Sequence, residues 1–215
     1  GRLKNFLSRA AQGERLTVGF IGGSITQGFA ATEPDQCYAA RTVAWLRKVF
    51  PNTEFDYVNA GIGATNSQFG AARVQEDLLC RLPDLVMVEF SVNDHCTPHD
   101  METYEGLIRQ IYGSRSCPAM VLLHSVYYDT GKSAAYYHAQ IGRHYDLPCI
   151  SMQNSIYPAV AAGRLPAEKI TADDENDYDK AQSIIRYLKK TGGYTYTTSP
   201  DEPDEEKKVQ LASDD

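Results

Sequence analysis

Three short segments of the sequence combine small residues with side chains that could serve acyl transfer. The first is residues 22–26 (GGSIT), in which Ser24 follows two glycines that allow close backbone approach. The second contains Gly61, and the third ends in Asn93 and Asp94. A serine hydroxyl is a nucleophile, whereas an unobstructed glycine N–H and an asparagine amide can stabilise an oxyanion. Together the segments indicate attack on an acyl group.

Taken alone, each segment also fits other roles. Residues 23–28 have the spacing of a phosphate-binding P-loop, but Phe29 stands where that loop needs lysine. A dinucleotide fingerprint would need a third glycine where the second segment has Asn66. We therefore expect no nucleotide cofactor. Ser24 could instead cap the following helix, and Asn93 could form a turn, so the segments must be considered together.

Short apolar runs alternate with longer amphipathic stretches along most of the chain. The runs predict β-strands at Leu16–Gly22, Glu54–Asn59, Leu85–Phe90, Met120–His124 and Pro148–Met152. The stretches predict helices at Leu3–Ala11, Tyr38–Phe50, Gln68–Leu82, Glu102–Tyr112, Ala134–Tyr145 and Tyr178–Lys190. Strands this apolar are buried on both faces. The alternation predicts an α/β fold, a three-layer α/β/α sandwich around a five-stranded parallel sheet.

The predicted sheet brings the three segments to one edge. Active groups of such sheets gather at the carboxyl ends of the strands. The loops that follow Gly22, Asn59, Phe90 and His124 are therefore where a site is expected. Ser24, Gly61 and Asn93 lie in the first three of these loops.

On these residues the chain resembles the SGNH (GDSL-type) hydrolases. The likeness rests on residues 22–26, on Gly61 and on residues 91–94 (SVND), in the family's order and spacing. The strand pattern agrees over residues 1–190. The resemblance implies a flavodoxin-like sandwich and a serine esterase that acts on small acyl esters or acetylated sugars. It also implies Ser24 as nucleophile, with the Ser24 and Gly61 amides and the Asn93 side chain as oxyanion hole.

The chain departs from the family in its last motif, which is Asp-x-x-His. Asp173 fits the aspartate of that motif, but Asn176 stands where the histidine belongs. No histidine follows His144. The residues on both sides of this motif match the family, as if a few residues between them had been lost. The loss could be a natural deletion, an engineered deletion or a gap in the recorded sequence. The resemblance thus implies Asp173 as a catalytic residue without its usual partner.

Five histidines remain as substitute bases. His95 directly follows the third segment and is the best candidate, while His124 ends a predicted strand and would be partly buried. His138 and His144 are expected to be structural. His95 and His99 have i, i+4 spacing, but the proline between them argues against the helical presentation that a metal site would use. We expect no metal.

Charge and composition narrow the class of partner. The net charge is −7, and residues 199–215 account for −5 of it. A nucleic-acid partner would need clustered cations, and no apolar run is long enough to span a membrane. We expect one hydrolase-like domain at 1–191 and an extended, disordered acidic tail at 192–215. The oligomeric state is not encoded in any pattern we recognise.

Cysteine usage bears on the compartment. The chain has an odd number of cysteines, widely spread and without a C-x-x-C pair: Cys37, Cys80, Cys96, Cys117 and Cys149. This fits reduced thiols and a cytoplasmic protein better than a disulfide framework. The first residue is Gly1, so a trimmed export signal stays open as an alternative.

These observations favour a serine ester hydrolase acting through an acyl-enzyme on Ser24, with a small-molecule ester as substrate. Because no histidine follows Asp173, the alternative is a degenerate relative that binds an ester or glycan without cleaving it. A flavin- or nucleotide-binding protein on the same fold has only fold analogy in its favour.

Overall fold

The computed structural model describes residues 1–29 and 31–165, which lie in one compact unit. The strands are β1 (Leu16–Gly22), β2 (Phe55–Gly61), β3 (Leu85–Glu89), β4 (Ala119–His124) and β5 (Cys149–Ser151). The longer helices are α1 (Arg2–Ala11), α3 (Tyr38–Val49), α4 (Ser67–Asp77), α5 (Pro98–Tyr112) and α6 (Ala135–His144). Short helical turns are α2 (Ser24–Gln27), α7 (Met152–Ser155), α8 (Tyr157–Ala161), η1 (Pro34–Gln36) and η2 (Leu79–Arg81).

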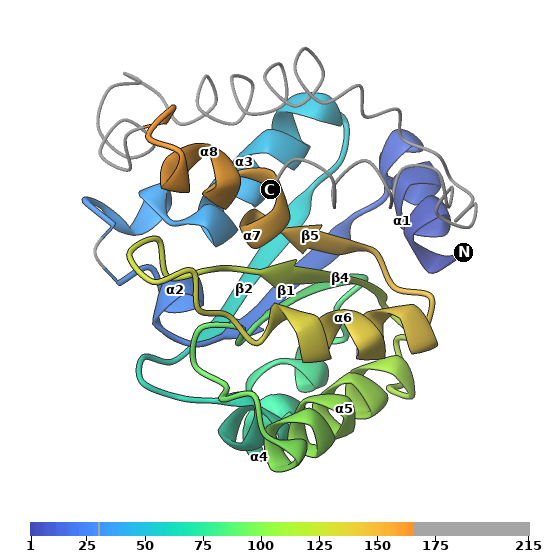
Figure 1. The fold of residues 1–215 in the computed structure, drawn as a ribbon. Coiled ribbons are helices and arrows are strands. Elements are labelled where there is room, and N and C mark those ends of the chain that lie inside the picture. Colours follow the sequence, from blue (N-terminus) through green and yellow to red (C-terminus); the bar gives the residue numbers. More distant parts are fainter. Residues whose placement is uncertain (30, 166–215) are drawn as a thin grey trace, which may run out of the picture. The chain divides into compact units, whose positions relative to one another are not determined.

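The strands form one parallel sheet in the order β2-β1-β3-β4-β5 (Figure 1). This is the flavodoxin-like order: β2 is added on one side of β1, and β3, β4 and β5 are added on the other side. All the strands end at the same edge because they are parallel. The predicted five-stranded parallel sheet is therefore confirmed.

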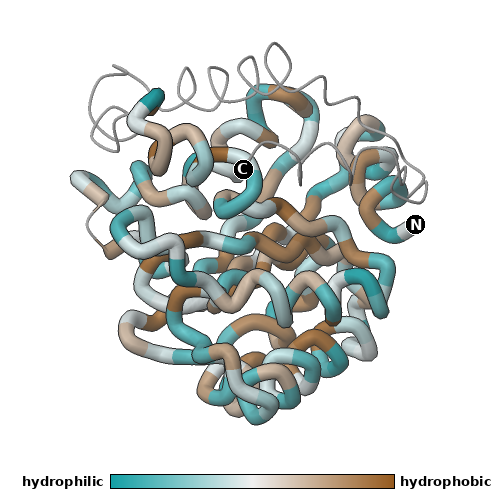
Figure 2. Tube along the Cα trace, viewed as in Figure 1, coloured by the Kyte–Doolittle hydropathy of each residue, from teal (hydrophilic) through white to brown (hydrophobic). Residues whose placement is uncertain are grey.

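Helices cover both faces of the sheet. In Figure 1, α4, α5 and α6 lie on one face, while α1 and α3 lie on the other. Two apolar cores result, one around Val86, Val88 and Leu122 and one around Phe20 and Met87. Figure 2 shows the hydrophobic segments concentrated along the strands. The inner strands β1, β3 and β4 are buried on both faces as predicted, whereas the edge strands β2 and β5 are partly exposed. The predicted three-layer sandwich is confirmed.

Helix α5 begins four residues earlier than the predicted start at Glu102. Pro98 is its first residue, and the Thr97 side chain accepts a hydrogen bond from the Asp100 N–H. Proline is favoured at a helix start, where its missing N–H costs nothing. His99 lies within α5 but His95 lies before its N-cap, so the two histidines are not presented on one helix, as the proline between them predicted.

Some predictions fall outside the described residues. They concern Asp173, the helix at Tyr178–Lys190, the domain boundary at residue 191 and the tail at 192–215. Among the helices of residues 1–29 and 31–165, none has the length and apolar character that crossing a bilayer requires.

Two helix-interior glycines offer a matched test of the packing between α4 and its neighbours. A Cβ on Gly70 of α4 would stand 2.6 Å from the buried Phe90 ring, whereas one on Gly106 of α5 would meet nothing within 4 Å. Overpacking a well-packed core lowers stability by about 1–3 kcal/mol. Where there is room for the methyl group, replacing a helix-interior glycine with alanine raises stability by about 0.5–1 kcal/mol. We expect Gly106→Ala to raise the free energy of unfolding in urea and Gly70→Ala to lower it. Equal effects of the two substitutions on the free energy of unfolding would contradict the close packing of α4 against Phe90.

Candidate active site

Ser24 stands where β1 ends and the one-turn helix α2 begins. The turn is tight, because a Cβ on Gly22 would lie 2.8 Å from the Thr26 Cβ and would overlap the Glu89 carbonyl oxygen. Gly28 ends α2 with a φ of 95°, a left-handed conformation that glycine adopts easily. Within the described residues the Ser24 N–H has no acceptor, so it is available to a ligand.

Asn93 lies against the backbone next to Ser24. A Cβ on Gly23 would stand 2.9 Å from the Asn93 Cγ and 3.2 Å from its Nδ2. The loop that carries Asn93 is closed by the Asn93 and Asp94 N–H groups, which both donate to the Phe90 carbonyl. In the described part of the chain the Asn93 side chain has no hydrogen-bond partner, and Oδ1 but not Nδ2 is buried. The amide group is thus a free donor close to the serine.

Gly61 approaches α2 closely, but its N–H is not free. The Gly61 N–H donates to Asn59 Oδ1 over 2.9 Å. A Cβ on Gly61 would lie 2.6 Å from the Thr26 carbonyl carbon. The expectation of an unobstructed Gly61 N–H is therefore wrong in this structure. The glycine is required instead for the close contact between β2 and α2.

The turn after Gly61 passes beside the serine. A Cβ on Gly63 would stand 3.8 Å from the Ser24 Cβ, and the Gly63 N–H donates to Gln27 Oε1 over 2.8 Å. The next residue, Ala64, has a φ of 57°, and its N–H has no acceptor in the described part of the chain. Ala64 thus supplies a free backbone N–H in this loop, in addition to the Ser24 N–H in the loop after β1. The sequence contains no signal for it, because nothing marks an alanine that adopts a left-handed conformation.

All five histidines lie in the described residues, and none is hydrogen-bonded to Ser24 there. His95 is exposed, and no hydrogen bond of its ring is present within the described chain. His99 contacts Gln68, and the buried His124 has its pKa lowered to about 4, chiefly by loss of solvation. His138 is buried against Asp94. The structure thus gives no support to His95 as a substitute base, and Asp173 lies outside the described residues.

A buried carboxyl group, that of Glu89, supports the loop that carries Asn93. Glu89, the last residue of β3, is fully buried, and its Oε1 accepts hydrogen bonds from the Ser91 N–H and hydroxyl at 3.0 and 2.7 Å. Oε2 has no partner among the described residues. Burial raises the pKa of Glu89 to about 7, although the Ser91 hydrogen bonds act in the opposite direction. The sequence did not reveal this residue, since it reads as one polar position in an apolar strand.

A buried cation supports the serine turn from the other face. Arg73 of α4 donates from Nη2 to the Gly22 carbonyl over 3.2 Å and pairs with Asp77 at 2.9 Å. Only 8% of Arg73 is exposed. The guanidinium group therefore fixes the backbone two residues before Ser24.

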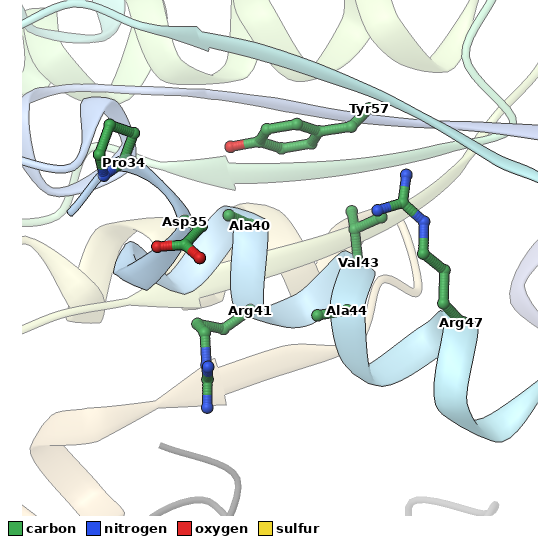
Figure 3. A pocket seen from close by; sticks show the side chains of 8 residues that line it. All are labelled: Pro34, Asp35, Ala40, Arg41, Val43, Ala44, Arg47 and Tyr57. Atoms are coloured by element: carbon green, nitrogen blue, oxygen red, sulfur yellow. The ribbon is translucent and has the colours of Figure 1, made fainter. Parts of the chain in front are cut away.

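The described chain also has a pocket of about 470 Å³ on the α3 face. Figure 3 shows Tyr57 of β2 above it and side chains of α3 below it; the lining residues are Pro34, Asp35, Ala40, Arg41, Val43, Ala44, Arg47 and Tyr57. No predicted site residue is among them. The candidate site is therefore the surface around Ser24, Asn93 and Ala64, which offers one hydroxyl and three N–H donors.

Comparison with known proteins agrees with this fold. The model of the GDSL-like lipase/acylhydrolase family matches residues 20–175, and the chain belongs to this family. A crystal structure of a two-domain esterase (CEX) active on acetylated mannans is 48% identical over 94% of this chain, with a TM-score of 0.80. That crystal contains mannopentaose, and the match covers 56% of that protein.

More distant relatives come from Geobacillus stearothermophilus. An acetylxylan esterase is 32% identical over 101 residues, which are 43% of this chain and 45% of that protein. The solved structure of a variant of Axe2, an acetyl xylan esterase, is 18% identical over 85% of this chain and 97% of that one, with a TM-score of 0.61, and shows the shared fold. The chain spans about half the length of the two-domain esterase and of the curated esterase.

The buried Glu89 should make stability depend on pH. Its folded-state pKa of about 7 exceeds the ordinary 4.5, so between these values the folded protein holds a proton that the unfolded chain has lost. Stability therefore falls as pH rises through this window, by on the order of 3 kcal/mol. Glu89→Gln removes the effect.

We expect the difference in unfolding free energy, Glu89→Gln minus wild type, to increase from pH 4.5 to pH 7. Urea unfolding at a series of pH values measures it, and subtraction cancels all other groups. A difference that stays constant with pH would show that folding does not raise the pKa of Glu89.

Proposed function

We propose that this chain is a serine esterase domain that removes acetyl groups from carbohydrates. The observation that carries the proposal is the placement of the Asn93 amide against Gly23, beside Ser24 at the start of α2. Family membership supports the reaction class. Similarity to esterases of acetylated mannan and xylan supports the substrate class, a small ester group on a sugar.

In the proposed reaction the Ser24 oxygen attacks the acetyl carbonyl carbon and loses its proton to a base. The carbonyl oxygen becomes an oxyanion, which the Ser24 N–H, the Asn93 Nδ2 and the Ala64 N–H stabilise. Ala64 replaces Gly61 in this role because the Gly61 N–H is bonded to Asn59. Collapse breaks the ester C–O bond, the sugar alcohol leaves with a proton, and water then hydrolyses the acetyl-serine.

A specific observation favours a second candidate, a protein that binds acetylated glycans without cleaving them. None of the five histidines is hydrogen-bonded to Ser24 in the described chain, and Asn176 stands where the family motif has histidine. Serine without a base is a poor nucleophile near neutral pH. In well-studied serine hydrolases the loss of one triad member costs up to about 10⁶ in turnover.

Replacement of the nucleophile separates the two candidates. We expect Ser24→Ala to reduce p-nitrophenyl acetate turnover to the buffer rate, because no acyl-enzyme can form. Ser8→Ala, at an exposed position of α1, is the matched control and should retain the wild-type rate. Turnover that is unchanged in Ser24→Ala would mean that the cleavage occurs elsewhere.

Restoring the missing base is the complementary change. Asn176→His recreates the Asp-x-x-His spacing with Asp173. A positioned general base contributes about 10²–10⁴-fold, so we expect Ser24-dependent turnover to rise at least about tenfold. The control is Asn176→His combined with Ser24→Ala, which should be inactive. A rise that survives in this double variant would contradict the proposed role of Ser24.

A further inference from the structure

A buried histidine is hydrogen-bonded to Asp94, the residue that follows Asn93. His138 of α6 places its Nε2 2.9 Å from Asp94 Oδ2, and the two side chains are 1% and 0% exposed. The other carboxylate oxygen, Oδ1, accepts the Ser67 N–H at the start of α4 over 2.8 Å. Asp94 thus connects the loop after β3 to two helices. None of these contacts is needed to form the sheet.

The loop is fixed at both ends and at the Asn93 backbone, whose N–H donates to the Phe90 carbonyl, but not at the Asn93 side chain. At one end, the Ser91 hydroxyl donates a hydrogen bond to the Glu89 carboxyl group, and the Ser91 carbonyl accepts one from the Ala134 N–H over 2.7 Å. At the other end, Asp94 is held by Ser67 and His138. Asn93 stands between the two anchors, and its side chain has no partner in the described chain. The position of its amide therefore depends on its neighbours.

The His138 ring is oriented by its surroundings. It stacks on Tyr104 with a centroid distance of 3.5 Å and an interplanar angle of 4°, and its centroid lies 5.9 Å from that of His124. Its Nδ1 is buried without a partner among the described residues. Asp94 is therefore the polar contact that this ring makes. A buried pair of this kind contributes little to stability on average, so stability alone does not explain it.

We propose that His138 is a positioning residue, which acts through Asp94 to hold the Asn93 amide in register with Ser24. The inference rests on the proposed esterase function. Asn93 would meet the oxyanion only as it forms, so its displacement lowers kcat and leaves KM nearly unchanged. A misplacement of about 1 Å can cost 10²-fold in rate. We expect a loss of 10- to 100-fold in kcat.

Two substitutions at the same position separate the hydrogen bond from the packing. His138→Phe keeps a flat ring against Tyr104 but removes the donor to Asp94. His138→Gln loses the ring but retains an N–H donor of similar reach. We expect the Phe variant to lose kcat and the Gln variant to recover most of it. The control is His144→Gln, an exposed histidine of the same helix.

A double-mutant cycle with Asn93→Ala tests the route of action. If His138 acts through Asn93, His138→Phe costs nothing further in kcat once Asn93 is alanine. Equal losses in both backgrounds would overturn the inference. Ser24→Ala is measured in the same assay, so that absent Ser24-dependent turnover counts against the proposed function and not against this step.

A second measurement needs no turnover. The side-chain NH₂ signals of Asn93 in ¹H–¹⁵N spectra of the full chain, assigned by their loss in Asn93→Ala, report its environment directly. We expect these signals to shift or broaden in His138→Phe and to stay in place in His138→Gln and His144→Gln. Unchanged Asn93 signals in His138→Phe would overturn the inference whatever the activity.

Discussion

The site depends on one constraint, which is that the loops after β1, β2 and β3 approach one another closely at a single backbone turn. The turn is Gly22-Gly23, and side chains at either position would overlap β3 or Asn93. Its polar groups are nearly all engaged: the Gly23 N–H donates to Glu89, and the Gly22 carbonyl accepts from Ile62 and Arg73. Such a turn cannot shift without breaking several contacts at once. Ser24 is therefore presented on a rigid element, as precise acyl transfer requires.

The topology of the sheet explains why these loops meet. With the order β2-β1-β3-β4-β5, the end of β1 lies between the ends of β2 and β3. The residues that follow these three strands are consequently neighbours, although they are separated by about 30 to 70 positions in the sequence. The reversal of strand order between β1 and β3 leaves the loop after β1 open to ligands. Fold and site geometry are thus one consequence of strand order.

Most of this architecture was predictable because burial on both faces makes parallel strands apolar, and the strands that flank the site are bounded within two residues of their prediction. Ser24 and Asn93 were found because they follow such strands. Gly61 misled because Asn59, two residues earlier, accepts the Gly61 N–H in a local Asx-type hydrogen bond that the interpretation of the sequence overlooked. Glu89 and His138 were missed as supports because their contacts are tertiary. Their roles depend on which helix packs against which loop, and a lone polar residue in an apolar element does not reveal it.

Two buried groups beneath the site, Glu89 and His124, change the stability of the fold with pH in opposite directions. Burial raises the pKa of Glu89 to about 7 and lowers that of His124 to about 4. Glu89 therefore reduces stability as pH rises from about 4.5 to 7, because the unfolded chain loses its proton first. His124 increases stability from about 4 to 6.5, because the unfolded chain holds a proton that the fold excludes. Where the windows overlap, the two slopes have opposite signs and equal size. The two buried groups at the ends of β3 and β4 thus offset each other in the pH dependence of stability where their windows overlap.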